Sequence, residues 1–261
     1  MNLTREVLLT RYEHGRIEET PDIVVREYPL TIFVNEEEFV TLLCSPNNLK
    51  YLSLGFLLSE GIIKEKSEIE YVEIDEGRNA AYINVKEKIN SSKHFTGKRI
   101  LTTGCGGGTM FYNVFGSLQG KGSDNKALIT YKNVISSMKE FSAKSEVFVN
   151  TGGVHSAALS NGEKILTFHE DVGRHNALDK VIGEAFDKGL NFSDKILLLS
   201  GRISSEMLTK AAKRNISIII SRSAPMDLAL EIGKELNMTI IGFARGERFN
   251  IYTGKERVML E

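Results

Sequence analysis

Residues 195–243, KILLLSGRISSEMLTKAAKRNISIIISRSAPMDLALEIGKELNMTIIGF, decide the fold class. Three runs in this stretch are continuously apolar, as in strands that are buried on both faces: residues 195–200, 216–221 and 239–243. The two segments between them, 204–215 and 226–237, have the apolar spacing of helices. Strands that alternate with helices in this way predict an α/β domain with a largely parallel sheet.

The pattern extends upstream. The segments VHSAALS and KILTFHE flank NGE, which predicts a hairpin, and HNALDKVIGEAFDKG then predicts a helix that ends at Gly189. The resulting order, ββ-α-β-α-β-α-β, predicts a three-layer domain with helices on both faces of the sheet. This is the topology of the zinc nucleoside deaminases, so we expect a cytidine-deaminase-like domain over residues 131–261.

The sequence pattern of the N-terminal part predicts a smaller α+β subdomain over residues 1–98. Strands are expected at 30–35 and 38–44, with a helix between Asn47 or Asn48 as its cap and Gly61 as its stop. A second hairpin is expected around DEGR, with strands in EIEYVEID and NAAYINV. Cys44 ends an apolar strand, so it is expected to be structural. Residues 99–130 are expected to be a glycine-rich active-site region.

Composition excludes several classes of protein. The chain has 261 residues, a formal net charge of -1 and two cysteines. It therefore carries no global basic field for nucleic acid or for anionic lipid. Two cysteines are too few for a disulfide framework, and no apolar run is long enough to span a bilayer. We expect a cytoplasmic protein with neither a nucleic-acid nor a membrane partner.

Cys105 lies in an unusual setting, TTGCGGG, with glycines at 104 and 106–108. A buried cysteine packs as a small hydrophobe, whereas glycines offer it no side chains to pack against. They leave room for another molecule to approach closely. This pattern indicates a thiol that is presented for chemistry.

Arginine recurs after the predicted strands. Helix N-termini and arginine side chains both suit phosphate, and ligands of α/β sheets bind beyond the carboxyl ends of strands. Four such loops predict a pocket for a polyanion such as a nucleotide diphosphate, although surface salt bridges and helix caps would give each loop a simpler explanation. The candidate binding residues are His169, Asp171, Gly173, Arg174, His175 and Asn176; Ser200, Gly201 and Arg202; Ser221, Arg222 and Ser223; and Phe243, Ala244, Arg245, Gly246, Glu247 and Arg248.

Zinc is not expected. Zinc deaminases use H-x-E and then P-C-x-x-C at successive helix starts. Here the corresponding positions carry HEDVGRHN and SGRISS, so the metal ligands are missing. His155 and His169 are equally compatible with a structural hydrogen-bonding role and with ligand contact. A nucleotide deaminase is disfavoured for the same reason.

The segments TTGCGGG, TGGVHSAAL, HEDVGRHNALDKVIG, SGRISSEM, SRSAP and GFARGERFNIYT, with LGFLLSEGII, resemble the formate dehydrogenase accessory sulfurtransferases of the FdhD/NarQ family. The resemblance covers nearly the whole chain. It implies a deaminase-like C-terminal domain, a homodimer, and a cysteine persulfide formed with a cysteine desulfurase. It further implies binding of a molybdenum or tungsten bis(molybdopterin guanine dinucleotide) cofactor, which receives sulfur before it enters the catalytic subunit of formate dehydrogenase.

Under this resemblance Cys105 is the persulfide carrier, and nearby arginines would favour its thiolate. Many members carry C-G-x-C in this loop, but here Gly108 stands at the second cysteine position. That departure argues against a mechanism with an internal disulfide. It also leaves open a second function, a chaperone that binds the guanine dinucleotide cofactor without transferring sulfur.

Overall fold

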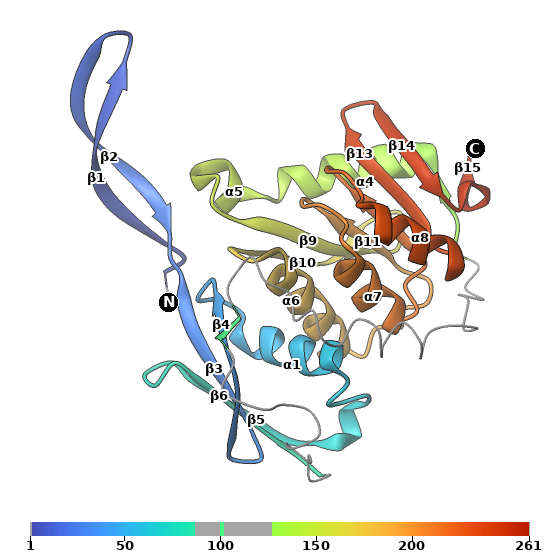
Figure 1. Cartoon of the computed structure of the whole chain (residues 1–261), viewed down its shortest axis with the longest axis horizontal. Helices are drawn as coiled ribbons and strands as arrows, with labels where there is room; N and C mark the ends of the chain where they lie inside the picture. The colour runs from blue at the N-terminus through green and yellow to red at the C-terminus, as the bar shows by residue number, and fades with distance from the viewer. Residues whose placement is uncertain (1, 87–99, 102–126, 261) are drawn as a thin grey trace.

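A six-stranded sheet forms the centre of the C-terminal half of the molecule (Figure 1). The computed structural model describes residues 2–86, 100–101 and 127–260. The sheet has the strand order β10-β9-β11-β12-β13-β14. Its strands are β9 (His155–Ser160), β10 (Ile165–Asp171), β11 (Ile196–Leu199), β12 (Ile218–Ser221), β13 (Thr239–Arg245) and β14 (Arg248–Thr253).

Helices cover both faces of this sheet, as the continuously apolar strands predict. Within β11, Leu197 and Leu199 pack with one set of helices, and Ile196 and Leu198 pack with residues of another helix on the opposite face. The first set is α6 (Arg174–Asp187), α7 (Ser205–Lys213) and α8 (Asp227–Glu235), and the opposite helix is α4 (Tyr131–Ala143). The α/β class and the predicted element order from β9 to β13 are therefore confirmed, while the cytidine-deaminase-like layering stays a prediction.

The six-stranded sheet contains one strand more at its C-terminal end than the sequence pattern predicted. The predicted last strand, β13, is followed by β14, which pairs with it in antiparallel fashion and forms the edge of the sheet. The segment FARGER is therefore the tip of a hairpin rather than a loop after the final strand. Two further short strands, β8 (Ile129–Thr130) and β15 (Val258–Met259), pair in parallel. This pairing places residues 258–259 beside the segment that leads directly into α4.

A five-stranded sheet of order β5-β6-β3-β4-β7 forms the N-terminal half. Its predicted hairpins are confirmed: β3 pairs with β4, and β5 pairs with β6. The strands are β3 (Tyr28–Val34), β4 (Glu37–Cys44), β5 (Ile69–Asp75), β6 (Ala80–Val85) and β7 (Ile100–Leu101), with the short 3-10 turns Lys66–Glu68 and, near the C-terminus, Lys255–Arg257. This half thus has the predicted α+β character.

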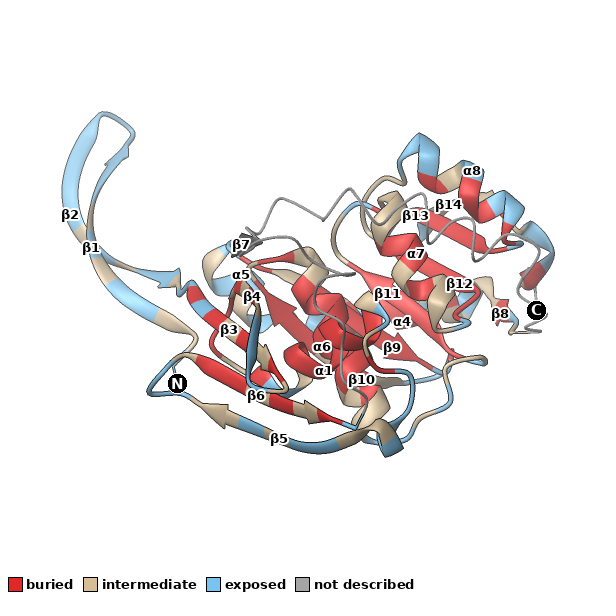
Figure 2. Cartoon of the chain, turned by 60° about the horizontal axis from the view of Figure 1, so that its bottom comes forward, coloured by how far each residue is buried: buried red, intermediate tan, exposed pale blue. Residues whose placement is uncertain are grey.

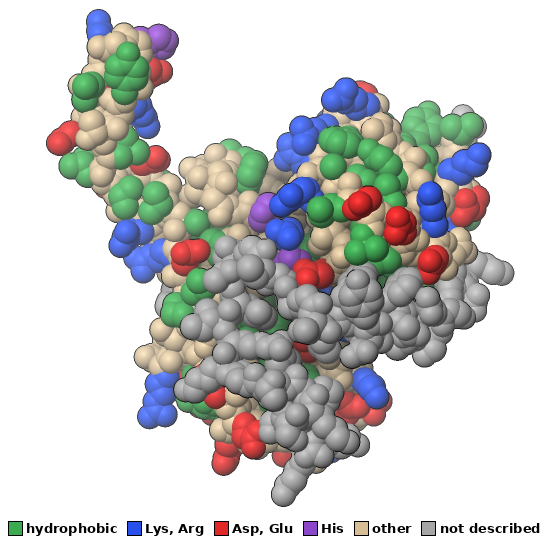
Figure 3. Space-filling model, viewed as in Figure 1, with side chains coloured by type: hydrophobic (Ala, Val, Ile, Leu, Met, Phe, Trp, Pro, Cys, Tyr) green, Lys and Arg blue, Asp and Glu red, His purple; other side chains and the backbone are tan. Residues whose placement is uncertain are grey.

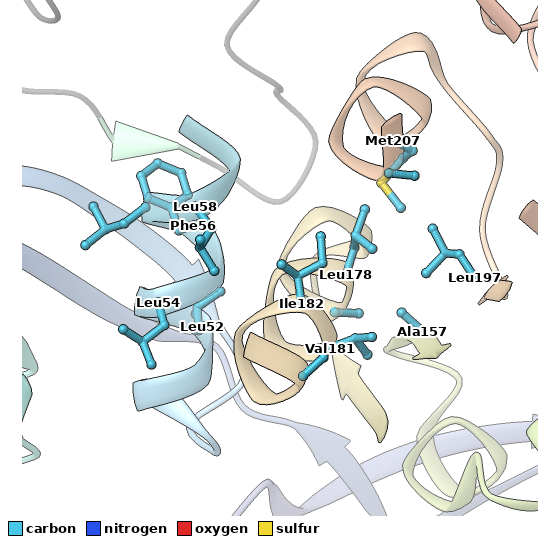
Figure 4. Packing of buried hydrophobic residues seen from close by; sticks show 14 of the residues in the cluster. Leu52, Leu54, Phe56, Leu58, Ala157, Leu178, Val181, Ile182, Leu197 and Met207 are labelled. Atoms are coloured by element: carbon cyan, nitrogen blue, oxygen red, sulfur yellow. The ribbon is translucent and has the colours of Figure 1, made fainter. Parts of the chain in front are cut away.

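Helix α1 (Leu49–Glu60) joins the two halves by packing along α6 (Figure 4). The two backbones approach at glycines: a Cβ on Gly55 would lie 1.8 Å from the Asp179 carbonyl oxygen, and a Cβ on Gly183 would lie 1.9 Å from that of Tyr51. The predicted stop at Gly61 is confirmed by its left-handed φ of 78°. Asn48 occupies the N-cap position, but its side chain makes no capping hydrogen bond.

A long two-stranded arm projects from the molecule, and the sequence analysis missed it. Strands β1 (Thr4–Glu13) and β2 (Arg16–Val25) pair only with each other. Figure 2 shows the arm as exposed or intermediate along its length, in contrast to the buried interior of both sheets. At its base it lies beside α5 (Glu146–Thr151). In the part of the chain that the structure describes, no helix is long and apolar enough to cross a membrane.

Candidate functional site

The four arginine-bearing loops follow the carboxyl ends of strands in the six-stranded sheet, and they lie on the same side of it. We call this side, where the strands end, the carboxyl edge of the sheet. Strand β9 is antiparallel to both β10 and β11, so β10 runs in the same direction as β11, β12 and β13. Their carboxyl ends therefore face the same way. Gly173 is the N-cap of α6, with Arg174 as its first residue, whereas Gly201 and Arg202 precede α7 by a short loop that ends at its cap, Ser204. Figure 3 shows lysine or arginine side chains gathered with histidine over this edge.

Positive charges converge around His155, the first residue of β9. Gly201 lies directly against it: a Cβ on Gly201 would be 3.2 Å from His155 Nδ1 and 3.6 Å from Arg174 Cβ. Burial lowers the pKa of His155, and the neighbouring charges of Arg174 and Arg202 lower it further. The imidazole is therefore held neutral beside two guanidinium groups.

Arg174 has an unsatisfied donor in this cluster. Its Nε is buried and has no hydrogen-bond partner among the described residues. Burial lowers the pKa of Arg174, and the charge of Arg202 lowers it further. His175 Nε2 lies 3.1 Å from Glu206 Oε2, and this contact lowers the pKa of Glu206. Two cationic side chains near each other with an unused N–H group form a setting that an anion would stabilise.

The loops after β12 and β13 are tied to the same edge. Ser221 Oγ donates to the Gly201 carbonyl at 2.6 Å, and Arg245 Nε donates to the Arg222 carbonyl at 2.8 Å. The backbone N–H of Phe243 donates to the Ser223 carbonyl at 3.1 Å. Phe243 has a φ of 52°, a left-handed conformation that costs energy for an aromatic residue and is typical of functional sites.

The remaining residues of these loops have different surroundings. Ser200 Oγ accepts from the Ser156 backbone N–H at 2.8 Å, so it holds β9 to the loop after β11. In the hairpin after β13, Ala244 is buried and Gly246 turns the chain with a φ of 57°. Glu247 and Arg248 are exposed.

Asp171 and Asn176 lie beneath the edge, in a buried network. Asp171 pairs with Lys180 at 2.6 Å, and both side chains are fully buried. Asp171 also accepts from the backbone N–H groups of Ser45 and Gly173 and from Asn176 Nδ2, at 2.9–3.0 Å. Lys180 Nζ in turn donates to the Ser45 carbonyl at 3.1 Å and to Asn47 Oδ1 at 2.7 Å. The network fixes the turn that carries Arg174 to the N-terminal half.

Sequence reasoning missed Lys180, Ser45 and Asn47. The one indication for Lys180 is its place in the segment ALDKVIG, where it and Asp179 interrupt the apolar residues of a helix that is buried along most of its length. A lysine at such a position needs a buried carboxylate.

The His169 side chain is buried, and both of its ring nitrogens lie within hydrogen-bonding distance of protein side chains. Its Nε2 lies 2.9 Å from Glu184 Oε2, and its Nδ1 lies 3.2 Å from Asn48 Nδ2. Since the Asn48 amide can only donate there, Nδ1 accepts and Nε2–H donates to Glu184. Burial lowers the pKa of His169 to about 4, so the ring is neutral at physiological pH.

Cys105 lies outside the described residues, as do Gly104 and Gly108. The described chain reaches this segment through β7, whose Leu101 pairs in parallel with Leu42 of β4. Cys44 is fully buried, and burial raises its pKa to about 12, as its predicted structural role requires. Among residues 2–86, 100–101 and 127–260, no three His, Cys, Asp or Glu side chains are grouped so as to hold a metal ion.

Comparisons with known proteins place this site in context. The model of the FdhD/NarQ family matches residues 25–259. The chain is 44% identical over 258 residues to a sulfur carrier protein FdhD of Bacillus pumilus, covering 98% of both chains. It is 43% identical over 249 residues to the sulfur carrier protein FdhD of Bacillus subtilis, covering 95% of both chains.

A solved structure shares the fold. A candidate formate dehydrogenase accessory protein from Desulfotalea psychrophila superposes with a TM-score of 0.80 at 24% identity, over 99% of this chain and 100% of that one.

Proposed function

The chain belongs to the FdhD/NarQ family, and from this premise we propose that it is a sulfur carrier that serves formate dehydrogenase. Its curated relatives carry that name, and they match it over nearly its whole length. The structural observation that carries the proposal is the cluster of Arg174, Arg202 and His155, in which the buried Arg174 Nε has no hydrogen-bond partner within residues 2–86, 100–101 and 127–260.

The substrate would be a metal cofactor that carries guanine dinucleotides, as the positively charged, anion-binding character of the site suggests. Arginine recognises phosphate oxygens with two parallel hydrogen bonds, and backbone N–H groups at the start of α6 favour negative charge. Gly201 leaves the space beside His155 and Arg174 that a side chain would fill. Arg222 and Arg245 would extend the contact toward a second phosphate group. The residues present thus fit a diphosphate ligand.

The chemistry would belong to Cys105. Its thiolate would attack the terminal sulfur of a persulfide on a cysteine desulfurase, releasing the thiolate of that enzyme and leaving a persulfide on Cys105. The S–S bond of the Cys105 persulfide would then break. The terminal sulfur would pass to the bound cofactor, which as substrate would supply the two electrons that convert this sulfur to sulfide, and the Cys105 thiolate would be left to take up a proton. The absence of a second cysteine at Gly108 is compatible with this scheme, because each step needs one sulfur atom on one residue.

The test is mass spectrometry after incubation with a cysteine desulfurase and cysteine. We expect the Cys105 peptide to gain one sulfur atom, and the Cys44→Ala variant to gain it equally. Cys105→Ala should lose both this gain and the ability to restore formate dehydrogenase activity in a host that depends on the protein, while it still binds guanosine diphosphate. Full activity in the Cys105→Ala strain would refute the carrier function and favour a chaperone that only holds the cofactor.

A further inference from the structure

Glu206 is a carboxylate among the cations of the carboxyl edge, and the proposed sulfur chemistry does not use it. It lies in the first turn of α7, where the loop that carries Arg202 ends at the cap, Ser204. Its Oε2 lies 3.1 Å from His175 Nε2, and its side chain is 30% exposed. The carboxylate therefore reaches the candidate site and also remains open to solvent.

The simplest explanation of this glutamate, a pair within its own helix, is not what the contacts show. Lys210 lies four residues further along α7, the spacing at which opposite charges on a helix pair. However, Lys210 Nζ donates to Asp179 Oδ2 at 2.5 Å, and the Asp179 carboxylate is buried. The close contact of Glu206 instead crosses to His175 on α6. Glu206 is therefore placed to act on the candidate site.

Glu206 and Arg174 influence each other's charge. Contact with His175 lowers the pKa of Glu206, and the charges of Lys210 and Arg174 lower it further, so the carboxylate is ionised at neutral pH. Burial and the charge of Arg202 lower the pKa of Arg174, and the charge of Glu206 opposes this shift. In the free protein Glu206 thus supplies part of the negative charge that two neighbouring guanidinium groups need. A bound anion would have to share these cations with it.

Repulsion from a carboxylate depends on how much charge the ligand places near it. A diphosphate that bridges two organic groups carries one negative charge on each phosphate. A terminal phosphate carries a second charge at neutral pH, because its second pKa is about 6. A nucleoside diphosphate therefore brings one more negative charge to the same cations than a dinucleotide with the same diphosphate does. A nearby carboxylate disfavours the first of these ligands more than the second.

We propose that Glu206 determines the specificity of the candidate site: its carboxylate disfavours ligands that end in a terminal phosphate, and so favours a diphosphate that bridges two groups. The inference rests on the proposed function, since it assumes that the arginine cluster binds a guanine diphosphate. Free guanosine diphosphate offers this cluster the same base and the same two phosphates as a guanine dinucleotide, so attractive contacts alone separate them poorly. Discrimination between such similar ligands commonly needs a repulsive element, and Glu206 supplies it.

Titration calorimetry in magnesium-free buffer at about pH 8 tests the proposal with two probes, guanosine diphosphate and guanosine diphosphate mannose, whose diphosphate is bridged. Glu206→Gln keeps the size of the side chain and removes its charge. It should strengthen binding of guanosine diphosphate by about tenfold and that of guanosine diphosphate mannose by less than about threefold. Each probe is compared between variant and wild type, so the bulk of the mannose does not enter the comparison.

Two further variants distinguish an effect of charge from an effect of packing. Glu206→Asp keeps the carboxylate, so the ratio of the two dissociation constants should stay within about threefold of the wild-type ratio. The matched control, Glu235→Gln, removes one carboxylate from the exposed C-terminal end of α8, and it should change neither dissociation constant by more than about twofold.

The two probes also separate failure of this inference from failure of the proposed function. Equal strengthening of both probes by Glu206→Gln, or no strengthening of guanosine diphosphate, would overturn the role of Glu206, while weaker binding of both probes by Arg174→Ala would show that the anion site stands. If wild type bound neither probe, or if Arg174→Ala changed neither affinity, the anion site itself would be refuted and the inference would fall with it.

Discussion

Arg174 is the residue on which the proposed anion binding would depend most directly. Its position as the first residue of α6 places it at the positive end of the helix dipole, and the buried network of Asp171 holds the preceding turn. Burial beside Arg202 disfavours its charge in the free protein, as the lowered pKa shows. A bound diphosphate would relieve this repulsion and provide the acceptor that Nε does not find in the part of the chain that the structure describes.

Alanine at Arg174 or Arg202 should therefore weaken guanosine diphosphate binding. The loss of one charge-assisted contact costs ~1.5–3 kcal/mol, or roughly 10- to 150-fold in affinity. Lysine at either position should recover only part of this, because it keeps the charge but loses the planar fork. Calorimetric titration measures the effect, with guanosine as the ligand that lacks phosphate.

The matched control is Arg78→Ala. Arg78 is exposed at the β5–β6 turn, 3.7 Å from Asp75, and should have no effect on nucleotide binding. Unchanged affinity in both the Arg174→Ala and the Arg202→Ala variants would remove these residues from the site. Arg245 and Arg248 would then be the next candidates for binding the phosphate groups.

At the scale of elements, the crossing of α1 and α6 depends on two glycines. Helix propensity alone predicts that Gly183→Ala stabilises the protein by about 1 kcal/mol. The close contact predicts the opposite, since the new Cβ would lie 1.9 Å from the Tyr51 carbonyl oxygen, which belongs to the backbone and cannot rotate away. We expect steric cost to win, with a net destabilisation of about 1–3 kcal/mol in urea unfolding.

Gly233→Ala provides the comparison for this prediction. Gly233 is also inside a helix, α8, but a Cβ there would meet the Cδ1 of Ile240, the end of a side chain that can move. It should cost less than Gly183→Ala. Equal or higher stability of the Gly183→Ala variant would show that the helices separate at little cost.

Elements were predictable from sequence where burial left a periodic pattern. The strands β11, β12 and β13 are continuously apolar because helices cover both faces, and this pattern gave both their positions and the edge where the arginines meet. Strand β14 was missed because it is an edge strand with only one buried residue and follows a turn that has no Asn-Gly or Asp-Gly. The arm was missed for a related reason, since neither strand has a buried face.

The supporting network of the site was beyond the reach of sequence patterns. Asp171 and Ser45 are 126 residues apart in the chain, and their contact depends on how the two halves pack. Lone polar residues such as Asn47 give no sign of a partner that far away. The arginines could be found because each follows a strand, whereas the residues that position them could not.

At the scale of the whole molecule, the two halves form one hydrophobic core. Leu52 and Leu54 of α1, Val181 of α6 and Leu197 of β11 belong to a single buried cluster (Figure 4). The pair of Asp171 and Lys180 reinforces the joint, because its hydrogen bonds reach Ser45 and Asn47 in the N-terminal half. The arginine-bearing loops of the candidate site are therefore positioned by contacts between the two halves, and most of the residues that make these contacts lie outside the loops.

Lys180→Met should destabilise both halves together. It leaves the Asp171 carboxylate buried without its cationic partner, which typically costs about 3–5 kcal/mol of unfolding free energy.

The chain has no tryptophan, so Phe39→Trp and Phe168→Trp can each supply a single fluorescent reporter, one in each half. Urea unfolding should give coincident midpoints for the two reporters, and Lys180→Met should lower both equally. The surface variant Lys188→Met, which loses only an exposed contact to Glu184, should cost no more than about 1 kcal/mol. Two separate midpoints, or a loss confined to one reporter, would show that the halves fold independently and that the network does not couple them.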